Sequence, residues 1–421
     1  MSHLLDELVR AQKQGELKGI PSICSAHPWV LKAALQKHGP LLIESTCNQV
    51  NQYGGYSGMT PGDFIRFVND IAERNKFPKD QLLLGGDHLG PSPWQEESAD
   101  SAMSKAAEMV QSYVRAGFAK IHLDASMRLA DDPPGSLDPE TAASRTADLA
   151  RIAEQTGRDR AIPPRYVIGT EVPTPGGAQD HKERVNVTTV ENARHAIEIT
   201  QAAFVKAGVE QAWERVTAMV VQPGVEFGDD FVLDYNPEAA KDLVKFCVGL
   251  PFVYEAHSTD YQKREALRCL VRDHFAILKV GPALTHAFRE ITFSLAKMEN
   301  ELVPAERRSN LVEVLEAAMI RKPEHWQKHY HGTPAEQAFA RKYSMSDRIR
   351  FYWTDSAVIA SLTKLLANLE GIPIPLPLVS QYAPQVFDRS QKGKVPFQPA
   401  MLIDAAIQQV LDDYRYACYL N

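Results

Sequence analysis

Short apolar segments alternate with longer amphipathic segments along the first part of the chain. The short segments are rich in aliphatic and β-branched residues and end in small or polar residues, as buried strands do. The longer segments, such as "TPGDFIRFVNDIAER", carry apolar residues at three- and four-residue spacing and open with Thr, Ser, Asp or Pro, as helices do. Eight strand-like segments start at residues 19, 40, 81, 120, 166, 216, 252 and 275.

These repeated βα units predict an α/β fold built on a parallel sheet. Eight units within roughly 270 residues match the usual size of a TIM (β/α)8 barrel. A doubly wound open sheet is the competing arrangement, but its common nucleotide-binding sequences are missing. No GxGxxG opens a helix after the first strand, and no GxxxxGK[ST] occurs in the chain. We therefore expect a TIM barrel with no nucleotide cofactor.

The pattern changes to charged helical segments near residue 290. "SLAKMENELVPAERRSNLVEVLEAAMI" is followed by aromatic and proline-rich pieces, "SMSDRIRFYWTDS" and "PIPLPLVSQYAP". We expect residues 1–289 to form the barrel with its active-site rim. Residues 290–421 should form a mainly helical C-terminal extension packed on that barrel.

Composition and charge narrow the class of partner. The chain has 421 residues, 44% of them hydrophobic, and a net charge of −7 with scattered basic residues, which argues against nucleic acid and anionic membranes. The N-terminus lacks the apolar core of a signal peptide, and no apolar run reaches membrane-spanning length. Five cysteines form no CxxC pair, so we expect reduced thiols and a cytoplasmic location. Small molecules and proteins remain as partners, including further copies of this chain.

Almost every predicted strand ends in polar residues, where the catalytic groups of a barrel lie. "GGDHLGP" places an acid and a histidine side by side at the end of the third strand. Carboxylates and imidazoles that converge on one rim are costly to desolvate unless they bind a cation or take part in catalysis. The polar residues at these ends include Ser25, His27, Glu44, Asn48, Gln49, Asp87, His88, His122, Asp124, Ser126, Thr170, Glu171, Gln222, Glu226, Glu255, His257, Ser258, Asp260 and Lys279.

Histidine and carboxylate ligands on separate strands are typical of catalytic divalent-metal sites. We expect His88 and His257 to be metal ligands, with Glu171 as the third and Asp124 or Gln222 as possible additions. The ion would be Zn2+, or Mn2+ if the ligand set is richer in oxygen.

Each of these residues also has a structural interpretation. An Asp-His step at the end of a strand fits a cap on the next helix. His122 alternates with two apolar neighbours and shares a face with Asp124, which favours a hydrogen-bonded core histidine over a ligand. Glu171 and Glu226 also fit solvated loop acids.

The loops after the last two strands of such barrels often bind phosphate. "AHSTD" and "KVGPALT" occur at these places, although their polar residues also fit simple helix caps. The loop "NQVNQYGGYSGMTPGDF" after the second strand is rich in amides, which can both donate to and accept from sugar hydroxyls. The candidate substrate and phosphate residues are Asn48, Gln49, Ser258, Thr259, Lys279, Gly281 and Thr285.

Taken together, the motifs resemble those of the GatZ/KbaZ family. They are "CSAHP", "NQVNQYGGYSGMTP", "GGDHLGP", "KIHLDASM", "VIGTEVPTPGG", "VVQPGVEF", "YEAHSTDYQ", "HFAILKVGPALT", "DRIRFYW" and "PLPLVSQY", in this order over essentially the whole chain. The family is described as the non-catalytic subunit of class II D-tagatose-1,6-bisphosphate aldolase, and it has also been labelled tagatose 6-phosphate kinase. Some relatives are D-tagatose 6-phosphate 4-epimerases.

The resemblance implies a TIM barrel related to the metal-dependent class II aldolases. By motif match, Asp87 would be a catalytic acid or base, and His88 and His257 metal ligands. The sixth strand departs from the aldolase pattern, because "VVQPGVEF" stands where those enzymes have a histidine. This difference leaves the third ligand open and favours chemistry other than aldol cleavage of a bisphosphate.

Two functions follow from the resemblance. One is a metal-dependent D-tagatose 6-phosphate 4-epimerase, in carbohydrate catabolism of the galactitol and tagatose type. Its candidate catalytic carboxylates are Asp87, Asp124 and Glu226. The other is a non-catalytic subunit that stabilises a separate class II aldolase subunit. A kinase is disfavoured because the chain has no nucleotide-binding loop.

Overall fold

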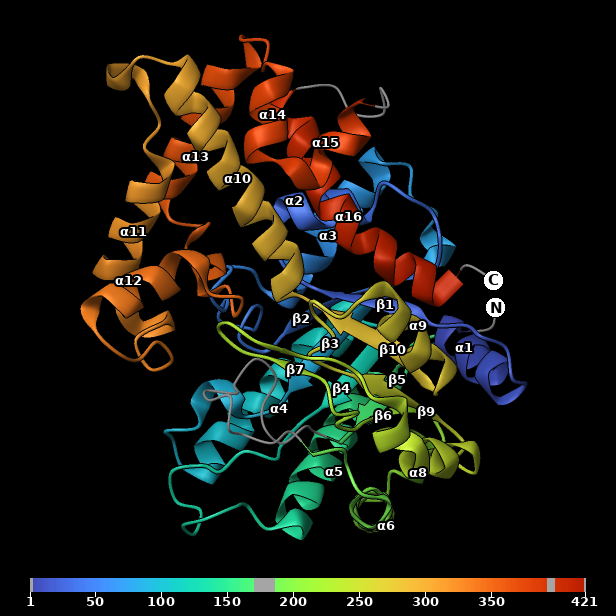
Figure 1. Ribbon diagram of the computed structural model, residues 1–421. Coiled ribbons are helices and arrows are strands. Elements are labelled where there is room, and N and C mark those ends of the chain that lie inside the picture. Colours follow the sequence, from blue (N-terminus) through green and yellow to red (C-terminus); the bar gives the residue numbers. More distant parts are fainter. Residues whose placement is uncertain (1–2, 170–185, 392–397, 420–421) are drawn as a thin grey trace.

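Eight parallel strands close into a barrel in the computed structural model, which describes residues 3–169, 186–391 and 398–419. The order around the barrel is β1-β10-β9-β6-β5-β4-β3-β2, so the last strand pairs with the first. The predicted TIM barrel is therefore confirmed (Figure 1). Its strands are β1 (Ile20–Cys24), β2 (Leu41–Thr46), β3 (Leu82–Leu89), β4 (Lys120–Leu123), β5 (Arg165–Ile168), β6 (Val216–Val220), β9 (Val253–Ala256) and β10 (Phe275–Val280).

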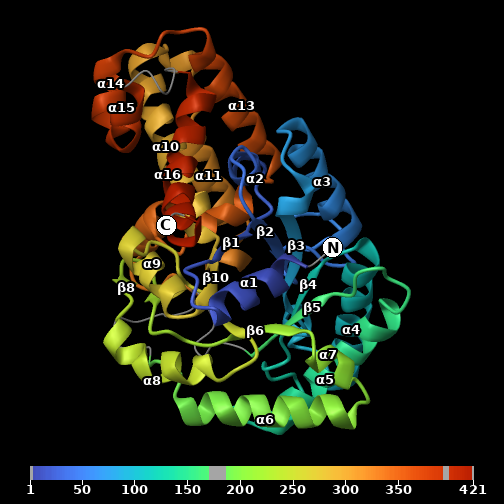
Figure 2. The ribbon, with the colours of Figure 1, turned by 90° about the vertical axis from the view of Figure 1, so that its right-hand side faces the viewer.

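Each strand is followed by at least one helix on the outside of the barrel (Figure 2). Capping residues begin several of these helices: the Thr60 and Asp63 side chains form a capping box at α3, and Pro61 occupies its first position. A short hairpin of β7 (Glu226–Phe227) and β8 (Val232–Leu233) follows β6. The helices are α2 (Pro28–Ala34), α3 (Pro61–Arg74), α4 (Ala99–Ala116), α5 (Pro139–Thr156), α6 (Val190–Lys206), α7 (Glu210–Trp213), α8 (Pro237–Val248), α9 (Arg264–Arg272) and α10 (Pro282–Leu302).

The N-terminal end of the barrel is closed by an apolar plug. Helix α1 (Leu4–Lys13) precedes the first strand, and its Leu5 and Leu8 are buried against the lowest inward-facing residues of the strands. These inward residues include Ile20, Leu42 and Val253. Because this end is sealed by hydrophobic packing, access to the barrel interior is from the C-terminal ends of the strands.

The C-terminal extension consists of helices that stack above one side of the barrel (Figures 1 and 2). Helix α10 runs without interruption through residues 289 and 290, the predicted boundary between barrel and extension. No helix of the described chain is long and apolar enough to cross a membrane. The elements of the extension are α11 (Leu311–Arg321), α12 (Pro334–Tyr343), α13 (Ser356–Glu370), α14 (Leu376–Tyr382), α15 (Pro384–Gln391) and α16 (Pro399–Tyr419), with short 3-10 turns η4 (Pro323–His325) and η5 (Arg348–Tyr352).

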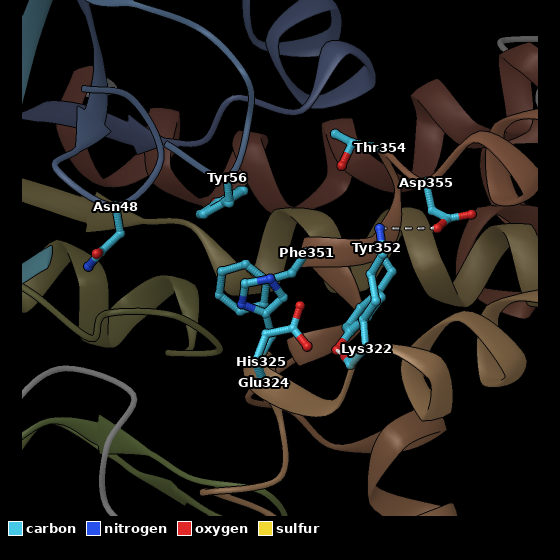
Figure 3. A pocket seen from close by; sticks show the side chains of 9 residues that line it. All are labelled: Asn48, Tyr56, Lys322, Glu324, His325, Phe351, Tyr352, Thr354 and Asp355. Carbon is cyan, nitrogen blue, oxygen red and sulfur yellow. Dashed lines mark hydrogen bonds and ion pairs between the residues drawn. The ribbon is translucent and has the colours of Figure 1, made fainter. Parts of the chain in front are cut away.

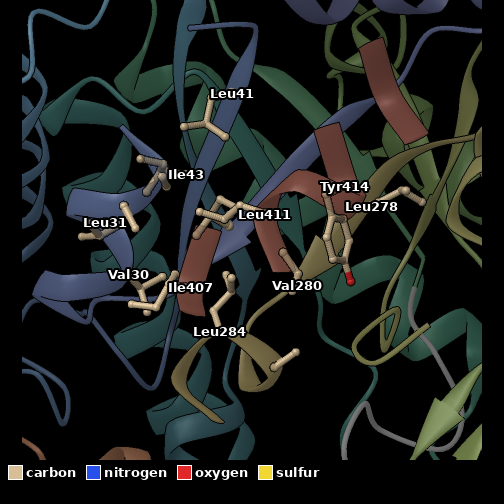
Figure 4. Packing of buried hydrophobic residues seen from close by; sticks show 14 of the residues in the cluster. Val30, Leu31, Leu41, Ile43, Leu278, Val280, Leu284, Ile407, Leu411 and Tyr414 are labelled. Carbon is tan, nitrogen blue, oxygen red and sulfur yellow. The ribbon is translucent and has the colours of Figure 1, made fainter. Parts of the chain in front are cut away.

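Helix α16 returns from the extension and packs on the first and last βα units. Ile407 and Leu411 are buried beside Leu31 of α2 and Leu284 of α10 (Figure 4). The Tyr414 hydroxyl donates at 2.8 Å to the carbonyl oxygen of Thr259, three residues after the end of strand β9. The end of the chain therefore stabilises the rim of the barrel at the point where β1 and β10 close it.

Candidate active site

The inward-facing side chains of the strands are apolar next to the plug and polar in the next layer toward the C-terminal ends of the strands. Side chains alternate along a strand, so the residues two positions beyond the apolar layer also point inward. Gly85 occupies one of these positions on β3, and a Cβ atom there would lie 2.4 Å from Glu44 Oε1. The glycine thus leaves the space that the Glu44 carboxylate fills. The buried polar layer comprises Ser22, Glu44, Lys120, His122, Glu255 and Lys279, with Asp87 and His257 above it.

Two lysines and three carboxylates form one ion-pair network inside the barrel. Lys120 Nζ lies 2.7 Å from Glu44 Oε1 and 2.6 Å from Glu255 Oε2. Lys279 Nζ lies 2.9 Å from Glu44 Oε2 and also pairs with Asp87. Burial opposes the charge of Lys279, but Asp87 and Glu44 hold its pKa well above the usual value. Likewise Lys279 keeps the pKa of Asp87 well below its usual value despite burial, so both groups are ionised.

Asp87 also belongs to a cluster with three histidines. Asp87, His88, His122 and His257 each offer one ligand atom, and these atoms all lie within 4.8 Å of one another. The rings of His88 and His257 are 4.9 Å apart between centroids and nearly perpendicular. The barrel therefore brings together the two histidines that the sequence predicts as metal ligands.

Both of these histidines contact a carboxylate through one ring nitrogen. His88 Nδ1 lies 2.8 Å from Asp124 Oδ2, and His257 Nε2 lies 2.9 Å from Glu255 Oε1. Metal-binding histidines in proteins commonly donate one N–H to a carboxylate and bind the metal through the other nitrogen. A cation here would be bound through His88 Nε2 and His257 Nδ1. The donor set thus fits a divalent metal, and the Asp87 carboxylate lies within 4.8 Å of these ligand atoms.

His122 has a different environment. Its Nδ1 lies 2.9 Å from Asp87 Oδ1, and its Nε2 lies 3.0 Å from the carbonyl oxygen of Gly169. The ring is fully buried. A cation on this ring would have to displace one of these oxygen acceptors, so the geometry favours His122 as a residue that positions Asp87. The predicted third ligand, Glu171, lies outside the described residues and stays a prediction.

Two residues of the site have a left-handed backbone conformation. His88 has φ of 47° and Ser258, directly after His257, has φ of 50°. Such a conformation costs a non-glycine residue roughly 1–3 kcal/mol and occurs often at functional sites. The buried Ser258 hydroxyl has no hydrogen-bond partner within the described ranges. Its polar atom is consistent with the predicted contact to substrate.

The other predicted catalytic carboxylates, Asp124 and Glu226, are not among the four residues of this cluster. Asp124 orients the His88 ring and accepts a hydrogen bond from the Ser126 hydroxyl at 2.6 Å, which indicates a positioning role. Glu226 lies on the β7 hairpin, where its Oε1 accepts from the N–H of Phe227. Gln222 Oε1 accepts from two backbone N–H groups of the following turn, and its side chain lines a cavity of about 800 Å³ with Asp124.

Four of the predicted substrate and phosphate residues, Thr259, Lys279, Gly281 and Thr285, have partners within the protein. The Thr259 hydroxyl donates to the carbonyl oxygen of Lys279, and the Thr285 hydroxyl donates to Asp347 Oδ2 at 2.6 Å. The N–H of Gly281 donates to Asp260 Oδ1 at 3.0 Å. Lys279 points into the barrel toward Glu44 and Asp87. A phosphate role for this set stays a prediction, and the geometry favours a place for Lys279 beside the reacting atoms.

The amide-rich loop after β2 faces the C-terminal extension across a cavity of about 610 Å³ (Figure 3). Asn48 and Tyr56 line it from the loop, and His325 and Phe351 line it from the extension. The Tyr56 and Phe351 rings are 4.7 Å apart, edge to face. His325 stacks on Phe351 and is half-buried. The extension therefore forms one wall of the barrel mouth.

Comparison with known proteins agrees with this architecture and with the motifs. Residues 5–419 match the family described as "D-tagatose-1,6-bisphosphate aldolase subunit GatZ/KbaZ-like". This chain belongs to the GatZ/KbaZ-like family. Proteins named D-tagatose-1,6-bisphosphate aldolase subunit GatZ from Salmonella dublin and Klebsiella pneumoniae are each 49% identical to it, over 98% of this chain and 99% of the relative.

A solved structure shares the fold over nearly the full length. It is described as a probable tagatose 6 phosphate kinase from Sinorhizobium meliloti 1021, and it matches with a TM-score of 0.87 and 47% sequence identity. The match covers 95% of this chain and 100% of that one. The extension therefore belongs to the GatZ/KbaZ-like architecture as much as the barrel does.

Two charged groups, one inside the barrel and one at its mouth, are absent from the site predicted from the sequence. Lys120 begins a strand and is fully buried, because its two carboxylate partners come from β2 and β9. The signal in the sequence is its two-residue spacing from His122, which places both on the inward face. Arg350 reaches the mouth from the extension, and its only signal is the motif "DRIRFYW".

Proposed function

We propose that this chain is the GatZ-type subunit of a D-tagatose-1,6-bisphosphate aldolase and assembles with a separate catalytic subunit. Its support is the set of relatives with that name, which align over 98% of the chain at 49% identity. In this role the chain stabilises its partner. The extension, which packs on both the first and last βα units, would keep the barrel rigid in the complex.

A specific observation also favours a catalytic role for the barrel. Its mouth holds two histidines with carboxylate partners, an ionised Asp87 and Lys279 beside it. Buried charges are costly, and two positive-φ residues add strain, so such a site is an unfavourable way to build a purely structural subunit. We propose, as the second function, that the chain is a metal-dependent ketose 6-phosphate 4-epimerase acting on D-tagatose 6-phosphate and D-fructose 6-phosphate.

The two sugars differ only in configuration at C4, and this fixes the chemistry. The C4 hydrogen is β to the C2 carbonyl and is not acidified, so its direct removal is a poor route. Removal of the C4 hydroxyl proton instead allows the C3–C4 bond to break, with its electron pair entering the C2 carbonyl as an enediolate. Rotation of the retained aldehyde and reformation of C3–C4 invert C4, and the proton returns to the new hydroxyl.

The residues of the mouth suit these steps. Asp87 is ionised, as a base that accepts the C4 hydroxyl proton must be. The Lys279 ammonium beside it offsets the negative charge that develops on the enediolate. A Zn2+ or Mn2+ ion held by His88 and His257 would supply Lewis-acid polarisation of the ketose oxygens. Asp124 and Glu255 fix the orientation of these two rings.

One set of measurements tests both functions. The purified chain is incubated alone with D-tagatose 6-phosphate and Mn2+ or Zn2+, and products are followed by NMR. A parallel sample contains a tagatose-bisphosphate aldolase subunit, whose activity and thermal stability are measured with and without this chain. His88→Ala removes a predicted ligand, and His195→Ala, an exposed histidine of α6, is the matched control.

The outcomes separate the two proposals. Formation of D-fructose 6-phosphate by the chain alone, lost in His88→Ala and kept in His195→Ala, supports the epimerase. No turnover with either metal contradicts it. Stabilisation of the aldolase subunit by both the wild type and His88→Ala supports the subunit function, and no effect on that subunit contradicts it.

A further inference from the structure

The usual phosphate position of a (β/α)8 barrel is occupied here by a carboxylate. In such barrels, backbone N–H groups after the last strand commonly bind phosphate. Asp260 Oδ1 instead accepts from the N–H of Gly281 at 3.0 Å and from that of Ala283 at 2.8 Å, at the start of α10. The Asp260 side chain is buried. A phosphate group at the same position would compete with this carboxylate, so another part of the mouth is better suited to bind it.

A cavity of about 450 Å³ lies between the end of strand β1 and the extension. Cys24 lines it at the barrel end, and Cys24 Sγ lies 3.6 Å from Asp87 Oδ2. Gln49 and Tyr56 of the β2 loop form one wall. Arg350, on η5 of the extension, lines it as well. The cavity thus joins the neighbourhood of Asp87 to a guanidinium group.

The Arg350 guanidinium is positioned by contacts within its own segment. Its Nη1 donates to the carbonyl oxygens of Ser346 and Asp347, and its carbon Cζ lies 4.5 Å from the centre of the Phe351 ring. Within the described residues, no carboxylate lies within ion-pair distance of Arg350. An arginine held by backbone carbonyls and outside ion-pair distance of the described carboxylates suits binding of an external anion, because its planar fork matches phosphate oxygens.

The backbone that carries Arg350 is fixed to the barrel. Asp347, three residues earlier, has φ of 49° and accepts from the Thr285 hydroxyl at 2.6 Å and from Arg289 Nε at 3.2 Å. Both donors belong to α10, the helix that follows the last strand. Thr285, predicted as a phosphate ligand, therefore acts on the site by holding the segment from which Arg350 projects.

A second arginine strengthens the positive charge. Arg348 has no ion pair among the described residues, and its Nη1 donates to the carbonyl oxygen of His325 at 3.2 Å. Burial and the charge of Arg350 lower the pKa of Arg348 to about 10, so it stays cationic at neutral pH.

The charge of Arg350 also affects Tyr56, in the loop across the cavity. Burial raises the pKa of the Tyr56 hydroxyl to about 12, and the charge of Arg350 partly offsets this rise.

We propose that Arg350 binds the phosphate group of the sugar phosphate, so that the C-terminal extension completes the binding site of the barrel. The ligand class, a ketose 6-phosphate, follows from the proposed epimerase function, on which this inference rests. The sugar would lie in the cavity with its reacting carbons toward Asp87 and its phosphate toward Arg350. The extension would then provide the preference for phosphorylated over free ketoses.

The test measures binding rather than turnover. Isothermal titration calorimetry of the full chain uses D-fructose 6-phosphate, D-fructose and inorganic phosphate as probes. We expect the wild type to bind the sugar phosphate more tightly than the free sugar. Arg350→Gln should weaken binding of both phosphate probes by about 10–100-fold, the usual effect of losing a charged hydrogen-bonded pair, and leave D-fructose unchanged. Arg350→Lys keeps the positive charge but loses the planar guanidinium, so it should lose less affinity for the phosphate probes than Arg350→Gln.

Arg307→Gln is the matched control, because Arg307 is an exposed arginine of the extension that does not line the cavity. Thermal denaturation checks that each variant is folded. If Arg350→Gln does not fold, the binding of Arg350→Lys is compared with that of the wild type instead. Unchanged phosphate binding in a folded Arg350 variant would overturn the proposal, as would a wild type that binds neither phosphate probe. Arg350-dependent binding without turnover upholds the anion site and contradicts the epimerase. If the Arg350 variants convert the sugar phosphate as fast as the wild type, only the proposed anion site is contradicted.

Discussion

His88 Nδ1 and Asp124 Oδ2 lie 2.8 Å apart, which fixes the His88 ring with Nε2 toward the cluster of Asp87 and His257. The Asp124 carboxylate is held in turn by the hydroxyl and N–H of Ser126. Burial opposes ionisation of Asp124, but His88 keeps its pKa below the usual value. Asp124 is therefore placed to orient His88, the predicted metal ligand.

Replacing Asp124 with Asn should weaken metal binding without removing a ligand. The amide keeps the shape of the side chain but loses the negative charge that orients and polarises His88, and such changes typically cost about 10–100-fold in metal affinity. Titration of the apoprotein with Zn2+ and Mn2+ measures the effect. Asp148→Asn, on the exposed side of α5, serves as control. Equal affinity in Asp124→Asn and the wild type would contradict the role of Asp124.

Gly85→Ala should destabilise the barrel, because the added Cβ would lie 2.4 Å from Glu44 Oε1. Glu44 cannot move freely, since it pairs with Lys120 and Lys279 and accepts from the Ser22 hydroxyl at 2.6 Å. Disruption of such a buried network should lower the free energy of unfolding by about 3 kcal/mol. Urea denaturation measures this.

Gly371→Ala provides the comparison for that variant. Its Cβ would meet no atom within 4 Å, and Gly371 has φ of −84°, which alanine adopts without strain. We expect little change in its unfolding free energy. If both alanine variants were equally stable, the close contact between residue 85 and Glu44 would not be a constraint on the fold.

The barrel could be predicted from the sequence because its signals are local. Each strand is a short apolar run that ends in polar residues, and Asp87 and His88 stand next to each other in one such run. His257 follows another strand by the same rule. Local patterns therefore located the rim of the barrel and the two histidines that meet there.

Other parts of the site depend on contacts between distant segments. Lys120 is buried by Glu44, 76 residues earlier in the chain, and by Glu255. Nothing near Lys120 in the sequence shows that closure of the barrel will bring these carboxylates to it. Arg350 reaches the mouth only because the extension folds back, and helical periodicity does not indicate where a helical segment will pack.

Lys120→Met should be strongly destabilising because it leaves Glu255 without its lysine partner inside the barrel. Removing one member of a buried ion pair costs about 3–5 kcal/mol. Adding Glu255→Gln removes the uncompensated charge. The double variant should therefore be more stable than the sum of the two single losses predicts, by about 1–3 kcal/mol. Denaturant unfolding of the four proteins gives this coupling, and purely additive losses would argue against the pairing.

Asp260 should make the stability of the protein depend on pH in an unusual direction. Burial raises its pKa from the usual 3.8 to about 6, although the N–H groups of Ala283 and Gly281 favour the ionised form. Between about pH 4 and 6 the folded chain therefore keeps a proton that the unfolded chain has lost. Ionisation of Asp260 then destabilises the folded state, so its contribution to the unfolding free energy decreases as pH rises through this window and stays low above it.

Asp260→Asn isolates this contribution, because an amide oxygen still accepts from the two N–H groups but does not ionise. Relative to the wild type, the variant should become more stable by up to about 3 kcal/mol between pH 4 and pH 7, at about 1.4 kcal/mol for each pKa unit. Urea unfolding of both proteins at several pH values measures the difference. A difference that is constant with pH, or that increases as pH falls, would show that the folded protein does not raise the pKa of Asp260. Its carboxylate would then be a fixed negative charge beside the cavity, and a phosphate at the start of α10 would be still less favourable than one at Arg350.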